Sequence, residues 1–109
     1  MAETIRVLAQ VDLSGTSLTD IYTVGAGLST SISSIVLTNR TAGDLTIRVS
    51  VAVAGLADTA KQYIRYDYPI PTGGSIDIIA GLTLAATDVI RAKTSVANVS
   101  VCVFGVEVG

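Results

Sequence analysis

The sequence predicts an all-β fold, an eight-stranded antiparallel β-sandwich with jelly-roll-like connections. Along residues 45–53 apolar and polar side chains alternate, which is the two-residue period of a strand with one buried face. Comparable segments recur along the chain, separated by loops of about four to seven residues, as in small sandwiches. The apolar residues are mainly Val, Ile, Leu and Ala, with no Trp, one Phe and four Tyr. Side chains of this kind suit thin, evenly packed sheets.

The chain of 109 residues is predicted to form one domain, residues 1–109, because this length supports one hydrophobic core. The predicted strands cover residues 4–12, 18–24, 31–39, 45–53, 61–69, 75–82, 87–95 and 98–108. Residues 40–44 are interpreted as a hairpin loop between two of them. Residues 35–37 are continuously apolar, which is typical of a strand buried on both faces or carrying a bulge. Pro69 and Pro71 exclude a central strand after them, because proline cannot donate to a ladder.

Two stretches also fit the apolar stripe of a helix, residues 49–60 and residues 82–90. The density of β-branched residues favours strands in both stretches, and residues 83–87 are expected to form the more helical turn. No segment offers ten clean residues of helix between strands, which excludes alternating β-α-β units.

Composition and charge limit the possible partners. The net charge is -2 and the pI is about 4.7, and the seven Lys and Arg residues form no basic run, which argues against nucleic acid. Residues 21–39 are uncharged, but their Ser and Thr content and strand period argue against a membrane span. Cys102 lies in an alternating apolar run and is predicted to be a small buried hydrophobe.

The candidate catalytic groups are few. The chain has no His, which removes the commonest general base at neutral pH and most zinc sites. Most of the Asp residues lie at or next to predicted turns, where the side chain bonds nearby backbone N–H groups. They form no calcium-type cluster, and no Gly pair continues into a phosphate-binding loop. We therefore predict a non-enzymatic protein with no catalytic residue, metal or cofactor.

The segment of residues 61–69 holds three of the four tyrosines. Alternation places Tyr63 and Arg65 on one face and Tyr66 and Tyr68 on the other. Tyrosine with arginine is a composition suited to a protein interface or to a platform for a sugar. The same pattern also fits an edge strand whose tyrosines belong to the core.

A second set of residues exceeds what one inward face per strand can bury. In a regular strand, each of these residues would point to the opposite face from an apolar neighbour in the same strand. They are Leu8, Ile35, Leu37, Ile79, Phe104, Val106 and Val108. Contiguous exposed apolar surface usually marks a subunit contact, so we predict a homo-oligomer or a component of an assembly.

Several segments together resemble a known protein family. They are Ile21-Tyr22-Thr23-Val24-Gly25-Ala26-Gly27, then Ser33-Ser34-Ile35-Val36-Leu37-Thr38-Asn39-Arg40, and Arg48-Val49-Ser50-Val51. This region resembles small virion proteins of tailed bacteriophages, and the likeness extends over about residues 1–108, including Lys61-Gln62-Tyr63 and residues 84–91. The chain departs from the pattern at Gly25, where the family usually has proline; this should loosen the turn without preventing folding.

The resemblance implies a β-sandwich building block of the virion, assembled in the host cytoplasm and without enzymatic activity. The first hypothesis is a capsid decoration or cement protein, a homo-oligomer whose partner is the major capsid protein. The alternatives are a head-to-tail, collar or tail-fibre adaptor and, from another class, a carbohydrate-binding module. Neither nucleic acid nor a membrane is an expected partner. The residues expected to make contacts are Tyr63, Arg65, Tyr66, Tyr68, Phe104, Val106 and Val108.

Overall fold

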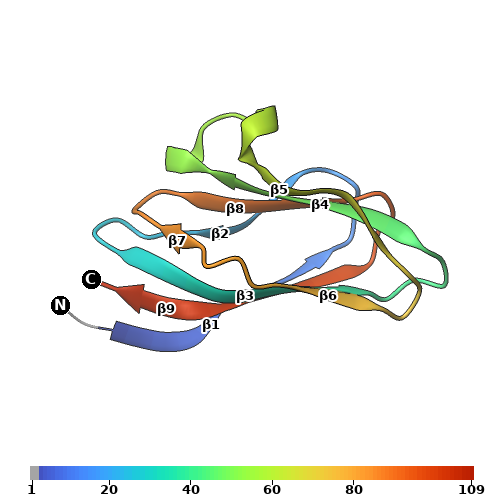
Figure 1. Ribbon diagram of the computed structural model, residues 1–109, viewed down its shortest axis with the longest axis horizontal. Helices are drawn as coiled ribbons and strands as arrows, with labels where there is room; N and C mark the ends of the chain where they lie inside the picture. Colours follow the sequence, from blue (N-terminus) through green and yellow to red (C-terminus); the bar gives the residue numbers. More distant parts are fainter. Residues whose placement is uncertain (1–2) are drawn as a thin grey trace.

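The computed structural model describes residues 3–109 and consists of two antiparallel sheets packed face to face (Figure 1). The strands are β1 (Glu3–Leu13), β2 (Thr19–Thr23), β3 (Ser29–Asn39), β4 (Leu45–Ala52), β5 (Tyr63–Ile70), β6 (Ser75–Ile78), β7 (Thr83–Leu84), β8 (Val89–Thr94) and β9 (Val99–Val108). Sheet A has the order β1-β9-β3-β6, with β7 also paired to β3, and sheet B has the order β2-β8-β4-β5. The predicted β-sandwich is confirmed, with nine strands rather than eight.

The additional strand, β7, lies just beyond the strand predicted over residues 75–82, which ends early as β6. The chain pairs with β3 twice, first as β6 and then, after a loop, as the two-residue β7. A turn follows, in which the Asp88 N–H donates to the Ala85 carbonyl at 3.1 Å. The Asp88 carboxylate also accepts hydrogen bonds from the N–H groups of Ala54 and Ala85, both at 2.9 Å. The predicted helical turn over residues 83–87 is therefore wrong, because this region is a strand followed by a single turn.

Residues 40–44 do not close a hairpin, because β3 lies in sheet A and β4 lies in sheet B. Asn39, at the end of β3, is buried and directs this crossing. Its side-chain amide donates to the carbonyls of Gly43, Ile70 and Pro71 at 2.9, 3.0 and 3.1 Å. The amide ties the end of β3 to the loop that follows it and to the end of β5, where the chain crosses from sheet A to sheet B. The predicted hairpin is therefore wrong.

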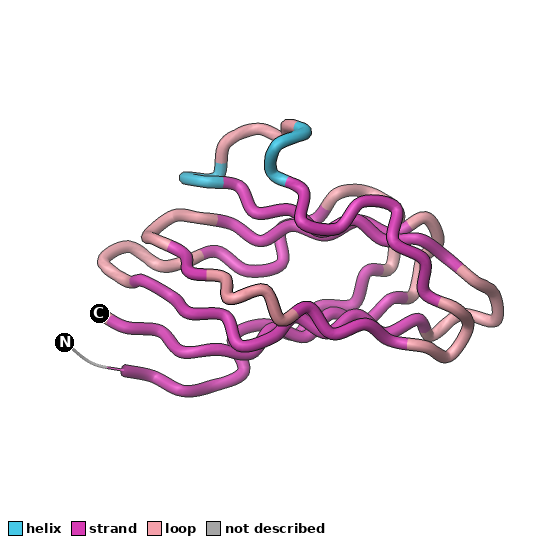
Figure 2. Tube along the Cα trace, viewed as in Figure 1, coloured by secondary structure: helices cyan, strands magenta, loops and turns pink. Residues whose placement is uncertain are grey.

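The connection from β4 to β5 contains two single 3₁₀ turns, η1 (Val53–Gly55) and η2 (Ala60–Gln62). Figure 2 shows both turns above sheet B, on the side away from sheet A. Ala54 and Gly55 have φ of 55° and 67°, which ends regular helix at this point. The helical alternative for residues 49–60 is wrong. Within residues 3–109 no helix has the length and apolar character needed to cross a bilayer.

The two sheets enclose a core of aliphatic side chains. Leu45, Ile47 and Val49 of β4 point inward and are at most 4% exposed, as the alternation of this segment predicts. Burying a side chain of this size stabilises the fold by about 1.5–3 kcal/mol. The largest fully buried side chains include Ile35, Leu37, Ile47, Ile70, Ile78 and Ile90.

Two β-bulges lie opposite residues 103–105 of β9, an interior strand of sheet A. One extra residue, Leu8, interrupts the pairing of β1 with β9, and another, Ser33, interrupts the pairing of β3 with β9. A bulge changes the face on which the following residues lie. Leu8, Ile35 and Leu37 are consequently buried in the core. The prediction that these three residues contribute exposed apolar surface is wrong.

A buried polar cluster joins the two sheets. The Tyr22 hydroxyl of β2 donates to the Glu107 carboxylate of β9 at 2.6 Å and lies 2.9 Å from the Thr30 hydroxyl of β3. Arg6 of β1 pairs with the other carboxylate oxygen at 2.9 Å. The hydrogen bond from Tyr22, together with Arg6, holds the pKa of Glu107 below its usual value. Burial, and next the bond to Glu107, raises the pKa of Tyr22, so its hydroxyl stays protonated as a donor.

We expect Glu107→Gln to lower the free energy of unfolding by about 2 kcal/mol at neutral pH, because Tyr22 and Arg6 lose a charged acceptor. The pKa of Glu107 is lower in the folded than in the unfolded chain. Its contribution is therefore complete above the unfolded pKa and is lost as the pH falls through the folded pKa. Urea unfolding at neutral pH and at successively lower pH should show the difference from the parent shrinking. Glu3→Gln, at an exposed position, is the control, and a difference independent of pH would contradict this role.

Candidate interaction surfaces

The residues predicted to make contacts lie on two surfaces in opposite sheets. The first group lies on β5, the edge strand of sheet B, and consists of Tyr63, Arg65, Tyr66 and Tyr68. The second group lies on β9, in the interior of sheet A, and consists of Phe104, Val106 and Val108. The edge position of β5 is compatible with Pro69, which it contains. The sequence-predicted residues therefore do not form one site.

The outer face of sheet A carries apolar side chains from β1 and β9. Directly opposed residues of antiparallel strands share a face, and the register pairs Ile5 with Val106 and Val7 with Phe104. Ile5 is 81% exposed and Val7 is 45% exposed, whereas the β9 residues are half-buried. We call this surface, formed by Ile5, Val7, Phe104, Val106 and Val108, the β1–β9 face.

The sequence also predicts the burial of Cys102 and the exposure of Ile79, both in or next to sheet A. Cys102 is half-buried on the outer side of β9, because alternation turns its neighbours Val101 and Val103 into the core. The prediction of a buried cysteine is wrong. Ile79 follows β6 and is 75% exposed, as predicted, but it lies toward the opposite edge of sheet A from β1.

Strand β5 does not alternate regularly. Its register with β4 shifts twice, with extra residues between the pairs Tyr68–Ile47, Arg65–Val49 and Tyr63–Ser50. Asp67, within the first irregularity, has a φ of 49°, a left-handed conformation that Asp tolerates. Tyr63 and Tyr66 consequently come together, and their predicted placement on opposite faces is wrong. Arg65 and Tyr68 instead pair with the core-facing residues of β4, at the margin of the sandwich.

The two tyrosines form a fixed aromatic corner on sheet B. The ring centroids of Tyr63 and Tyr66 are 5.2 Å apart and the rings are nearly perpendicular, at 87°. The guanidinium carbon of Arg48 lies 4.0 Å from the centroid of Tyr66. Arg48 also donates to both carboxylate oxygens of Asp67, at 2.6 and 3.2 Å, and this bond lowers the pKa of Asp67. Tyr66 is 60% exposed, so the tyrosine is not a core residue.

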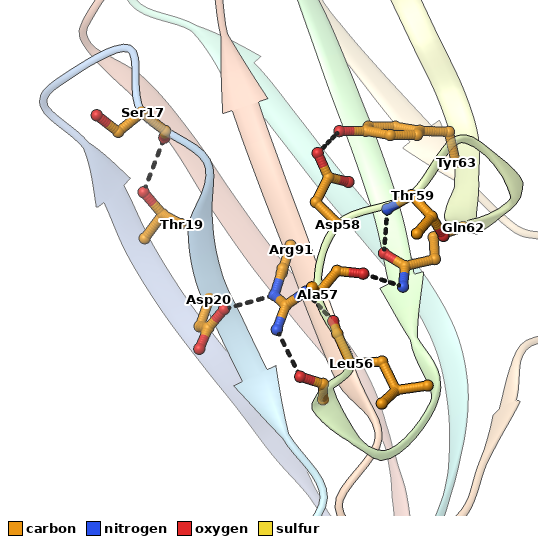
Figure 3. A network of polar contacts seen from close by, with 11 residues as sticks. Ser17, Thr19, Asp20, Leu56, Ala57, Asp58, Thr59, Gln62, Tyr63 and Arg91 are labelled. Atoms are coloured by element: carbon orange, nitrogen blue, oxygen red, sulfur yellow. Dashed lines mark hydrogen bonds and ion pairs between the residues drawn. The ribbon is translucent and has the colours of Figure 1, made fainter.

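The loop of residues 53–62 is fastened to the outer side of sheet B by Arg91 of β8 (Figure 3). The Arg91 guanidinium donates to the carbonyls of Leu56 and Gly55 at 2.7 and 3.1 Å. It also pairs with Asp20 of β2 at 2.8 Å. One side chain thus holds the loop against two neighbouring strands.

The same loop is closed internally beside the aromatic corner (Figure 3). The Gln62 side chain donates to the Ala57 carbonyl at 3.0 Å and accepts from the Thr59 N–H at 3.4 Å. The Tyr63 hydroxyl donates to Asp58 at 2.9 Å. Burial, and next this bond to Asp58, raises the pKa of Tyr63, so the phenol remains neutral at physiological pH.

The loop and the aromatic corner enclose a groove of about 570 Å³, which we call the tyrosine groove. It is lined by Arg48, Asp58, Thr59, Ala60, Tyr63 and Tyr66. The sequence pattern points to the two tyrosines of this groove but not to Arg48, Asp58 and Thr59. The alternation of β4 is a signal that Arg48 faces outward, but no local pattern indicates that it lies beside the tyrosines.

Comparison with known proteins shows similarity at the level of fold. No protein-family model matches the chain, and no curated protein matches it. Among solved structures, the chain is similar to one from the acidic stable capsid structure of Helicobacter pylori bacteriophage KHP30, with a TM-score of 0.50 and 16% sequence identity. The match covers 99% of this chain and 98% of that one. The two chains therefore share one sandwich architecture from end to end.

Proposed function

We propose that this chain is a non-enzymatic structural protein of a bacteriophage virion, and specifically a decoration protein that binds the coat lattice. The observation that carries the proposal is the end-to-end similarity of fold to a chain of a phage capsid structure. The sequence resemblance to small virion proteins of tailed phages points to the same class of protein. Its partner would be the major capsid protein, and it would join the virion during assembly in the host cytoplasm.

The strand order supports assigning the sandwich to the jelly rolls. Sheet A contains β1, β3, β6, β7 and β9, whereas sheet B contains β2, β4, β5 and β8. Strands consecutive in the chain therefore lie mostly in opposite layers, and the first and last strands are neighbours in sheet A. Double-sheet jelly rolls are frequent among viral capsid proteins.

We assign the contact with the coat lattice to the β1–β9 face. Ile5 and Val7 are exposed, and they extend an apolar surface that continues onto the half-buried Phe104 and Val106. Contiguous exposed apolar surface in a protein of this size commonly marks a protein contact. Repetition by the symmetry of the particle would sum many modest contacts of this kind.

The copy number distinguishes decoration from the alternative role of a head-to-tail, collar or tail-fibre adaptor. Decoration of a coat lattice requires on the order of hundreds of copies in each particle, whereas an adaptor ring requires about a dozen. Quantitative mass spectrometry of purified virions, with the major capsid protein as internal standard, measures this number. A value near a dozen would exclude decoration, and absence from purified virions would exclude a structural role in the virion.

We expect Ile5→Asp to abolish attachment to particles while leaving the fold intact, because the side chain is 81% exposed. A carboxylate at this position would have to lose its hydration in the contact without gaining a partner. Co-sedimentation with virions that lack the protein measures attachment. Ile79→Asp is the matched control, because Ile79 is 75% exposed and lies toward the other edge of the sheet.

Attachment of Ile5→Asp equal to that of the parent would show that the coat lattice does not use the β1–β9 face. Light scattering of the isolated protein gives the second arm of the test. If Ile5→Asp dissociates an oligomer of the isolated protein, the face is covered by a second copy and the assignment to the coat is wrong.

A further inference from the structure

The tyrosine groove lies on the outer side of sheet B, in the layer opposite the β1–β9 face. Its aromatic wall is held in place before any ligand arrives. Arg48 packs on the Tyr66 ring and is itself fixed by Asp67, while Tyr63 is fixed by its bond to Asp58. A groove whose walls are already ordered loses little conformational entropy on binding.

The groove is lined by one positive group, Arg48, and one negative group, Asp58, and this combination disfavours an ion as the ligand. Arg48 would repel a cation, although two tyrosine rings and a carboxylate otherwise resemble a cage for a quaternary amine. Asp58 would repel an anion, although Arg48 alone would attract one. The groove therefore favours a neutral ligand that uses both kinds of group.

The lining offers donors and acceptors suited to hydroxyl groups. The guanidinium of Arg48 has five N–H donors, and only its Nε and Nη2 atoms are engaged with Asp67. The Asp58 carboxylate accepts one bond from Tyr63 through Oδ2 and has further lone pairs. Thr59 also lines the groove. The negative face of a tyrosine ring complements the weakly positive C–H groups on one side of a pyranose ring.

We propose that the tyrosine groove binds a neutral saccharide unit, with the sugar ring packed against the Tyr63–Tyr66 corner and its hydroxyls bonded to Arg48 and Asp58. The volume of about 570 Å³ lies in the range of small-ligand sites and accommodates one or two sugar rings. Tyr68 takes no part, because it pairs with the core-facing Ile47 and does not line the groove. The proposal concerns the isolated protein and does not depend on its place in a virion.

The test is titration of the isolated protein with methyl glycosides and disaccharides of neutral hexoses and N-acetylhexosamines. Choline and inorganic phosphate serve as charged probes. NMR resonances of the four tyrosine rings report binding, and the chain has no Trp, so tyrosine fluorescence provides a second readout. We expect at least one saccharide to shift the Tyr63 and Tyr66 signals, with millimolar affinity as suits a small ligand in an open site.

Three variants locate the site. Tyr66→Ala should weaken saccharide binding about tenfold, since it removes a main contact of the ring. Asp58→Asn should weaken it several-fold because a charged acceptor becomes neutral. Tyr68→Ala is the matched control, an exposed tyrosine of the same strand outside the groove, and it should bind as the parent does.

The proposal is overturned if no saccharide of the panel shifts the tyrosine signals up to its solubility limit. It is also overturned if Tyr66→Ala binds as tightly as Tyr68→Ala, or if choline or phosphate binds in preference to every saccharide. Tyr66 is 60% exposed, so its removal should leave the fold intact, and a circular dichroism spectrum of each variant verifies this.

Discussion

Gly105→Ala should lower the free energy of unfolding by about 2–3 kcal/mol, toward the upper end of the cost of overpacking. A Cβ atom at this position would lie 2.3 Å from the carbonyl oxygen of Ser31 and 3.1 Å from the Cα atom of Ile32. Both belong to the backbone of β3, so rotation of a side chain cannot relieve the contact. The third neighbour is the Leu8 side chain, at 3.1 Å, which enters the core through the bulge in β1.

Thermal or urea unfolding measures the effect of Gly105→Ala, and the melting temperature should fall by about 10 °C for a chain of this size. Gly15→Ala is the matched control, because a Cβ atom at Gly15 would have no atom within 4 Å beyond its chain neighbours, and the φ of Gly15 is not positive. We expect the control to unfold at the parent's temperature or slightly above it. If Gly105→Ala unfolds at the same temperature as Gly15→Ala, the bulged segments of β1 and β3 can move apart freely and the prediction is wrong.

Val49→Asp should abolish cooperative folding. Val49 is 0% exposed and faces the core from the middle of sheet B, between β5 and β8. An unpaired carboxylate there costs at least several kcal/mol, either as a buried charge or through forced protonation, in addition to the lost apolar burial. A loss of this size is comparable to the whole stability of about 5–15 kcal/mol typical of a domain.

Near-UV circular dichroism and solubility of the expressed protein test Val49→Asp. Val53→Asp, four residues further along the chain and 64% exposed, introduces the same charge and should fold normally. A soluble Val49→Asp protein with a cooperative unfolding transition would contradict the position of this residue in the core.

The alternation of apolar and polar residues predicts most of the strands. It predicts the face of the sheet on which each side chain lies only where the strand is regular. In β9, and in β4 as far as Val49, burial alternates as predicted and the inward side chains form the core. In β1, β3 and β5, bulges exchange the faces, so Leu8, Ile35 and Tyr66 lie where alternation does not place them. A bulge depends on the neighbouring strand: the missing side chain of Gly105 in β9, for example, leaves space for Leu8 of β1. The sequence of one segment does not show which residues of another strand will lie beside it.

The candidate sites show the same division between local and long-range information. Tyrosine content identified Tyr63 and Tyr66, but Arg48 and Asp58 join them only through strand pairing and the closure of the loop after β4. The error at residues 40–44 has a similar origin, because loop composition does not show that Asn39 binds the carbonyls of Ile70 and Pro71. The roles of Phe104, Val106 and Val108 in contacts stay predictions.

The position of β9 between β1 and β3 has a consequence for how the chain folds. Arg6 and Glu107 meet although they are 101 positions apart, and β1 has no other neighbour within sheet A. Sheet A therefore cannot be built stepwise from local hairpins, and non-local pairing of this kind places folding in the range of milliseconds to seconds. Until β9 inserts, β1 exposes an unpaired edge that carries Ile5 and Val7. While the chain is being synthesised, that interval is when strands of neighbouring chains can compete for the place of β9.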